Sequence, residues 1–297
     1  MSIPESQLET WCNQGATVTS AAAYTSIKAA LADPKSKVRE LNPEIYLQGS
    51  YGNSTNIFAD SDVDVAVQYN SVYDWDVSSL PLPQQMLFAA VPKVNHSWRD
   101  FHAQVVESLR SYYGVTAVDP GNKAIKVTLN SGRTVDVLAA KQYRKFTFFQ
   151  SVQVESHVEG VEFQDNSGRA IINFPKEHIK NGEAKNALPR TSYRYKQTVR
   201  MFKNARNCAI DRRLLSADVA PSYFVECMLY NVPDNLFSGA RQVTFSGVID
   251  FLRTKLVVAD AICQNGQVKL FGSTPEQWDT AKAGALVDGL INLWNNW

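Results

Sequence analysis

Hydrophobic residues recur with two different periods along this chain, and the change of period predicts how it folds. Short apolar or alternating stretches, typical of strands, occur at 45–49, 63–69, 124–129 and 135–140. Helical spacing occurs at 18–31 and 99–113, and it returns from Thr191 onward. Strands mixed with helices, followed by helices alone, predict an α+β fold with a mixed sheet and a helical C-terminal lobe.

We place the domain boundary near residue 185. Residues 1–185 are predicted to form a core lobe with an N-terminal helix, and residues 186–297 a helical lobe that closes a ligand pocket. The polar stretch 150–190 is expected to contain short strands and loops, and 74–92 a surface connection with a short helix. Asn130-Ser131-Gly132 has the turn chemistry of a β-hairpin, which would pair the strands on either side.

An acidic run lies on one of the predicted strands. Asp62 and Asp64 alternate with Val63, Val65 and Val67, so both carboxylates should point to one face of the sheet and the valines to the other. A further carboxylate, Asp136, lies within an apolar strand, where an unpaired charge is costly. Carboxylates on rigid strands suit Mg²⁺ or Mn²⁺ rather than Zn²⁺.

Two other interpretations of Asp60-Ser61-Asp62-Val63-Asp64 were weighed. An EF-hand requires glycine at loop position six and glutamate at position twelve, where this chain has Val65 and Ser71, so that interpretation fails. A solvated acidic turn is the simpler alternative for an isolated run. This run follows Gly49-Ser50, a small turn after an apolar strand that lets backbone N–H groups approach a phosphate. A phosphate turn and carboxylates together predict phosphoryl or nucleotidyl transfer.

The composition is that of a soluble cytosolic enzyme. The chain has 297 residues, 44% of them hydrophobic, which is enough to bury a sizeable core. Its first residues lack the basic and apolar segments of a signal peptide, and no apolar stretch reaches the roughly 20 residues of a membrane span. Four scattered cysteines are expected to be reduced thiols. The net charge of +1 argues against general electrostatic binding of nucleic acid.

One segment, together with the three aspartates that follow it, carries a family resemblance: Leu47-Gln48-Gly49-Ser50-Tyr51-Gly52-Asn53-Ser54-Thr55-Asn56. It resembles the bacterial cGAS/DncV-like nucleotidyltransferases, a family of the polymerase-β-like nucleotidyltransferase superfamily. The resemblance implies the polymerase-β-like fold and the joining of NTPs into a cyclic di- or trinucleotide with release of pyrophosphate. It also implies a setting in the bacterial cytoplasm, in antiphage signalling, with a separate effector protein that senses the product. Its catalytic metal ligands would be Asp62, Asp64 and Asp136, and Gln48, Gly49 and Ser50 would bind the nucleotide.

The same resemblance extends to the C-terminal lobe. Relatives bind the donor triphosphate and base with a lysine on one helix and a Ser-Tyr pair on the next, which here implies Lys203 and Ser222-Tyr223. Arg200 or Lys196 is the alternative source of the cation, and Lys196 is expected to lie on a solvated face. The zinc-binding insertion of the animal synthase has no counterpart, so no requirement for double-stranded DNA is expected.

Other functions remain open at this level. The acceptor is a second nucleotide in the leading hypothesis, and an RNA 3′ end, an antibiotic or a protein in the alternative. A relative that only binds nucleotides would usually lack one of the carboxylates, and all three are present here. The histidines His157 and His178 are expected to be surface residues, because metal-bound carboxylates can handle the proton in nucleotidyl transfer.

Overall fold

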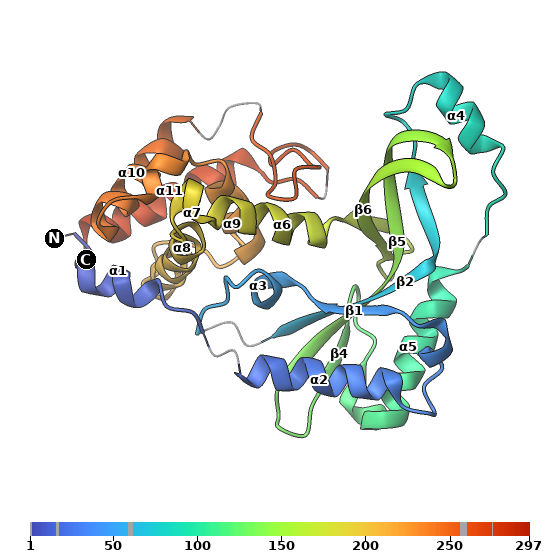
Figure 1. Ribbon diagram of the computed structural model, residues 1–297. Helices are drawn as coiled ribbons and strands as arrows, with labels where there is room; N and C mark the ends of the chain where they lie inside the picture. The colour runs from blue at the N-terminus through green and yellow to red at the C-terminus, as the bar shows by residue number, and fades with distance from the viewer. Residues whose placement is uncertain (1, 16–17, 59–61, 95, 256–259, 275) are drawn as a thin grey trace. The chain divides into compact units, whose positions relative to one another are not determined.

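The computed structural model describes residues 2–15, 18–58, 62–94, 96–255, 260–274 and 276–297, and it divides into two compact units (Figure 1). The sheet unit comprises Thr17–Gly52 and Ser61–Glu177. The helical unit comprises Met1–Ala16, Asn53–Asp60 and His178–Trp297. Asp60 and Ser61, the first two residues of the acidic run, lie outside the described residues.

This division differs from the predicted boundary at residue 185. Two N-terminal segments, 1–16 and 53–60, belong to the helical unit, which itself begins at His178. The reason is bonding that the sequence does not display. Helix α1 (Glu5–Trp11) packs against the C-terminal helices, and Asn53 bonds to Glu226 across 173 residues of chain.

The sheet of the sheet unit is mixed. Among the described residues, seven strands form one sheet whose main path runs β1-β2-β5-β4-β3, with β6 paired to β5 and β7 to β6. Strands β2 and β5 are parallel and the other neighbours are antiparallel. The strands are β1 (Glu44–Leu47), β2 (Val63–Asp76), β3 (Val118–Asp119), β4 (Ile125–Thr128), β5 (Thr134–Ser151), β6 (Val154–Gln164) and β7 (Ala170–Asn173).

One face of this sheet carries the core of the unit. Val63, Val65 and Val67 of β2 are fully buried with Val135 and Val137 of β5. Helices α2 (Val18–Ala32) and α5 (Trp98–Tyr113) cover this face, as the blue and blue-green helices of Figure 1 show. Helix α5 is strongly amphipathic and ends at Gly114, as predicted. The valine face thus fixes the opposite face as the place for the alternating aspartates.

The long ends of β2, β5 and β6 extend beyond this core. Helix α4 (Leu82–Ala89) packs there, with Phe88 against Phe146 and Phe149 of β5. The short elements of the unit are the 3-10 turns η1 (Arg39–Leu41) and η2 (Val115–Ala117) and the one-turn helix α3 (Gly49–Gly52).

The helical unit has its own apolar core. Phe202 of α8, Phe224 of α9 and Phe245 of α10 are fully buried in it, together with Leu8 of α1. Its remaining elements are α6 (Pro175–Asn186, which begins in the sheet unit), α7 (Leu188–Thr191), α8 (Tyr195–Asp211), α9 (Ser222–Tyr230), η3 (Asp234–Phe237), α10 (Arg241–Lys255) and α11 (Thr280–Asn295).

Most predicted elements are confirmed, and the exceptions share one region. The hairpin at 130–132 forms, because β4 and β5 pair on either side of it. The prediction of short strands and loops for 150–190 holds for β7, a short strand that ends at Asn173, but it was wrong for most of the stretch. Strand β5 continues to Ser151, β6 is a long partner, and α6 occupies 175–186.

The structure also bears on the cysteines and on membrane-spanning helices. All four cysteines are free thiols. Within the described ranges, no helix combines the length and the apolar character needed to cross a bilayer.

Candidate functional site

The predicted carboxylates meet on neighbouring strands of the sheet unit. Asp64 of β2 lies directly opposite Asp136 of β5 in the parallel register, flanked by the Val63–Val135 and Val65–Val137 pairs. Residues in register point to the same face, so both carboxylates lie on the face opposite the valine core. Asp62 stands just before β2, and the Thr134 hydroxyl donates to its Oδ1 at 2.5 Å. The sheet therefore brings the three aspartates together where the neighbouring strands β2 and β5 begin.

The surroundings of Asp136 raise the pKa of its carboxyl. Partial burial raises the pKa of its carboxyl, and the nearby Asp62 raises it further, while Lys126 opposes both. Lys126 lies opposite Asp136 on β4. A bound cation would offset the charge that Asp62 places beside the Asp136 carboxyl, as expected of a metal site.

Gly49 brings the chain against the Asp64 carboxylate. Its φ of +60° is a left-handed conformation, and a Cβ atom there would overlap Oδ2 of Asp64. The backbone N–H of Gln48 donates to the Asp64 carbonyl at 3.0 Å, which ties the two segments together. Ser50 follows inside the one-turn helix α3. The predicted phosphate turn thus lies beside the carboxylate pair.

These residues fit a divalent cation that shares its shell with a substrate. The part of the chain that the structure describes contains no group of three or more His, Cys, Asp or Glu side chains arranged to enclose a metal ion. Mg²⁺ is characteristically held by one or two carboxylates together with substrate phosphates and water, rather than by a complete protein cage. Asp64 and Asp136, with the Gly49-Ser50 turn beside them, supply the protein part of such a site.

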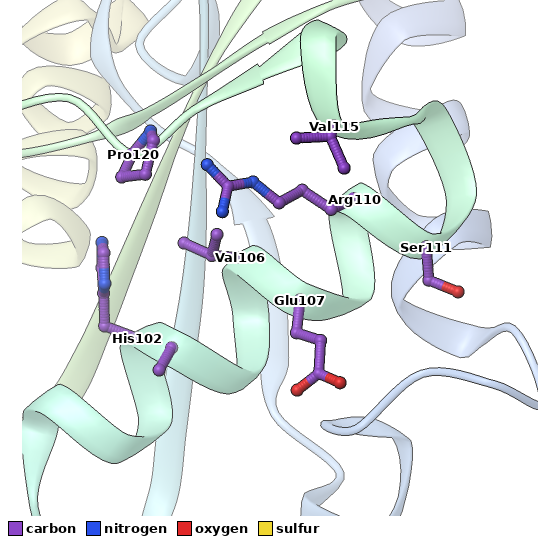
Figure 2. A pocket seen from close by; sticks show the side chains of 8 residues that line it. His102, Val106, Glu107, Arg110, Ser111, Val115 and Pro120 are labelled. Atoms are coloured by element: carbon purple, nitrogen blue, oxygen red, sulfur yellow. The ribbon is translucent and has the colours of Figure 1, made fainter.

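A separate hollow on the sheet unit does not overlap this group. His102, Val106 and Arg110 of α5 line it, and Figure 2 shows Arg110 extending toward Pro120. Since α5 covers the valine face of the sheet, this hollow belongs to the side opposite the aspartates.

In the helical unit, Ser222 and Tyr223 begin helix α9, as predicted. Tyr223 is 41% exposed, and its ring stacks on His178 with centroids 5.1 Å apart and planes 27° from parallel. The Asn265 amide donates to the Tyr223 hydroxyl at 3.2 Å. An aromatic ring with one supported face and an exposed part is suited to stacking on a base.

The structure gives the predicted cations other partners. Lys203 is fully buried, and its ammonium donates to Glu226 Oε1 at 2.5 Å and to the Thr55 carbonyl at 3.1 Å. Arg200 donates to the backbone carbonyls of Cys12 and Ser54. The solvated face expected for Lys196 is wrong, because that residue is buried.

The ammonium of Lys196 bonds to Glu183 of α6 at 2.5 Å. Its partner comes from the helix that the sequence analysis missed, so the cationic stripe of α8 faces protein carboxylates and carbonyls.

The cation that reaches Ser222 is Arg206, which the sequence analysis missed. Its guanidinium donates to the Ser222 hydroxyl at 3.2 Å and to the Ala220 carbonyl at 2.8 Å. Its spacing of three residues from Lys203 on one helix was the available signal. Glu226 was also missed, although a single carboxylate inside the apolar helix Ser222–Tyr230 requires a buried partner.

The two histidines that were expected at the surface, His178 and His157, differ in their environments. His178 is 8% exposed and bonds to Glu226, so the surface position expected for it is wrong. His157 is half-buried on β6, where it pairs with Glu155 at 2.8 Å.

Known proteins resemble this chain along its whole length. Residues 180–295 match the model of the cGAS/DncV-like nucleotidyltransferase C-terminal helical domain. The cyclic UMP-AMP synthase of Rhodothermus marinus (strain SG0.5JP17-172) is 44% identical over 100% of this chain and 99% of its own length. The cyclic nucleotide synthase CdnE01 of Staphylococcus haemolyticus is 34% identical over the full length of both chains.

Solved structures give the same picture. The Rhodothermus marinus CdnE c-UMP-AMP synthase, solved with Apcpp and Upnpp, superposes with a TM-score of 0.87 at 44% identity, covering 99% of this chain and 97% of that one. The Elizabethkingia meningoseptica CdnE cyclic dinucleotide synthase, solved with GTP and Apcpp, gives 0.74 at 30% identity, covering 99% and 98%. The chain is an α+β protein with a nucleotidyltransferase fold. It belongs to the cGAS/DncV-like nucleotidyltransferase family.

Proposed function

We propose that this protein is a cyclic oligonucleotide synthase, which joins NTPs into a cyclic di- or trinucleotide and releases pyrophosphate. The observation that carries the proposal is the in-register pair Asp64–Asp136 with Gly49 packed against it. The full-length similarity to the 44% identical cyclic UMP-AMP synthase supports UTP and ATP as the first substrates to test. Antiphage signalling through a separate effector, in the bacterial cytoplasm, is the setting that the family resemblance implies.

The proposed chemistry assigns a task to each group of residues. Asp62, Asp64 and Asp136 would hold Mg²⁺ or Mn²⁺, which when bound neutralises phosphate charge and lowers the pKa of the attacking hydroxyl. Gln48, Gly49 and Ser50 would form the turn that binds the donor phosphates, through the backbone N–H groups of Gly49 and Ser50 and the Ser50 hydroxyl. In the helical unit, Ser222, with Arg206 beside it, would contribute an anion contact, and Tyr223 would stack on the donor base.

The reaction itself is an in-line displacement. A bond forms between the acceptor ribose oxygen and the α-phosphorus of the donor, while the hydroxyl proton passes to a carboxylate of the site. The bond from that phosphorus to the β-phosphate oxygen breaks, so pyrophosphate leaves. Positioning and charge neutralisation supply most of the acceleration in such transfers. A second displacement within the linear intermediate closes the ring.

The decisive experiment is incubation of the purified protein with all four NTPs and Mg²⁺ or Mn²⁺, followed by phosphatase treatment and mass spectrometry. We expect a phosphatase-resistant cyclic species that contains uridylate and adenylate. The Asp62→Asn, Asp64→Asn double variant should fold normally and make less than about one thousandth as much product, because several kcal/mol of charge stabilisation are lost. Equal product from this variant would refute the assignment of the carboxylates.

A second function is kept because the sequence leaves the acceptor open. Transfer to an RNA 3′ end, an antibiotic or a protein would use the same carboxylates. Linear product on an added acceptor, without a cyclic species from NTPs alone, would favour this alternative.

A further inference from the structure

A buried polar cluster surrounds Glu226, one helical turn from the Ser222-Tyr223 pair on α9. The Glu226 side chain is 4% exposed, and both of its oxygens are occupied. Oε1 accepts from the Lys203 ammonium and the Thr55 hydroxyl, each at 2.5 Å. Oε2 accepts from the Asn53 amide and from His178 Nε2, the latter at 3.0 Å. All five residues belong to the helical unit.

The charges in this cluster are balanced by contact. Burial alone would raise the pKa of the Glu226 carboxyl, but the Lys203 ammonium and His178 outweigh burial and hold that pKa well below its usual range. Glu226 is therefore a fixed anion whose oxygens are committed to four donors from three different segments of chain. Such a group orients its partners, since each of them has one favourable direction toward it.

One of those partners supports the tyrosine. The bond from His178 Nε2 to Glu226 fixes how the imidazole is turned, and the face of that ring is stacked on Tyr223. His178 is 8% exposed whereas Tyr223 is 41% exposed. The imidazole thus covers one face of the phenol ring, while part of the ring stays accessible.

We propose that Lys203, Glu226 and His178 act on the donor nucleotide through Tyr223, as positioning residues. Lys203 fixes Glu226, Glu226 fixes the imidazole, and the imidazole holds the phenol ring as a platform for the nucleobase. The proposal rests on the proposed function, because it takes Tyr223 as the residue that stacks on the base. It replaces direct contact between Lys203 and the triphosphate, the role that the family resemblance implies.

The surroundings of Lys203 favour the indirect role. An ammonium has three N–H donors, and here it has acceptors in Glu226 Oε1, the Thr55 carbonyl and the Thr55 hydroxyl, the last at 3.3 Å. A phosphate could take this cation only by leaving the buried Glu226 carboxylate unpaired, which is strongly unfavourable. Arg206, by contrast, already contacts the Ser222 hydroxyl.

The test compares two ligands that share a triphosphate, a nonhydrolysable ATP analogue and inorganic tripolyphosphate, each with Mg²⁺, by titration calorimetry. His178→Leu should weaken binding of the ATP analogue about tenfold, because base stacking on an aromatic ring is worth that much. Its affinity for tripolyphosphate should stay within about twofold, since the loss concerns the base alone. His178→Phe restores a ring against Tyr223 but cannot bond to Glu226, so it should recover only part of the lost affinity.

The matched control is His157→Leu, which removes a histidine of the sheet unit that pairs with Glu155. It should leave both affinities at the wild-type level. Unchanged binding of the ATP analogue by His178→Leu, or an equal loss with tripolyphosphate, would refute the positioning role.

Lys203 is tested in a form that keeps the interior neutral. Lys203→Met alone leaves a buried carboxylate without its cation and is expected to fold poorly. The Lys203→Met, Glu226→Gln double variant removes both charges. We expect it to unfold cooperatively, to raise KM about tenfold with little change in kcat, and to bind tripolyphosphate as the wild type does. A tenfold weaker affinity for tripolyphosphate would show that Lys203 contacts the phosphates after all.

Failure of this proposal can be separated from failure of the proposed function by Tyr223→Ala. If this variant binds the ATP analogue as the wild type does, Tyr223 is not the base platform and that part of the proposed function fails. If Tyr223→Ala weakens binding but His178→Leu does not, the platform stands and only the positioning role is refuted.

Discussion

At the scale of single residues, the chemistry of this chain depends on a glycine. Gly49 adopts a left-handed conformation, and any side chain there would overlap the Asp64 carboxylate. The backbone conformation and the nearby acid thus impose two separate demands on one position. The first demand is shared with other turns of the chain, and the second is specific to the carboxylate site.

Gly49→Ala tests these two demands separately. Left-handed strain should lower the free energy of unfolding by about 1–2 kcal/mol, and displacement of Asp64 should lower kcat about 100-fold or more. Gly132→Ala is the matched control, because Gly132 has a φ of +78° and nothing within 4 Å of the added Cβ. It should lose similar stability and keep its activity, as urea titration and an NTP turnover assay would show. Equal activity losses in the two variants would contradict the prediction.

At the scale of elements, the N-terminal helix is fastened to α10 by a carboxylate. Both Glu5 oxygens accept backbone N–H groups at the start of that helix, from Arg241 at 2.5 Å and from Gln242 at 2.8 Å. The first turn of a helix has unpaired N–H donors and a positive dipole end, so an anion there satisfies both.

Glu5→Gln should therefore lower the free energy of unfolding by about 1 kcal/mol, since the amide offers one acceptor and no charge. Glu107→Gln serves as the control, because the Glu107 side chain is exposed on α5. Its Oε1 lies 3.7 Å from Lys37 Nζ in a pair that water surrounds. Its effect should be within about 0.5 kcal/mol. Equal losses in urea titrations of the two variants would argue against the cap.

The elements also show what the sequence can and cannot predict. The valine alternation of β2 was sufficient to place Asp64 on the face opposite the core, because a strand has only two faces. Its direct pairing with Asp136 depends on the register between strands 72 residues apart, which no local pattern specifies. Helix α6 was missed because its buried residues are His178, Gly182 and Lys185, none of which appears in a hydrophobic pattern.

The cations of α8 show the same limit. Helical spacing correctly put Lys196, Arg200 and Lys203 on related faces, but it cannot show what lies opposite. Their acceptors come from α6, α9 and the N-terminal segments, so the difference between a phosphate ligand and a buried ion pair is decided by tertiary structure.

At the scale of the whole molecule, stability should depend on pH through an acid on β6. Burial and the nearby Asp74 carboxylate raise the pKa of Glu162 to about 7, while Lys141 opposes them. The folded protein then binds a proton more tightly than the unfolded chain. Its free energy of unfolding should therefore fall as pH rises from the ordinary pKa of 4.5 through about 7.

Glu162→Gln removes this dependence. Between pH 5 and pH 8 the wild type should lose about 1 kcal/mol more stability than the variant, after allowance for solvent screening of a half-exposed group. Urea titrations at the two pH values measure the difference. A variant whose stability falls with pH as steeply as that of the wild type would show that Glu162 is not responsible.

The bonds of Asn53 and Thr55 to Glu226 have a consequence for how the protein is made. Synthesis runs from the N-terminus, so both residues leave the ribosome more than 170 residues before the carboxylate that they bind. The sheet unit is complete at Glu177, whereas the helical unit must gather segments translated first and last. A fragment that begins near residue 180 would contain Glu226 without Asn53, Thr55 or His178. We therefore expect such a fragment, although it spans a recognisable domain, to be a poor candidate for independent folding.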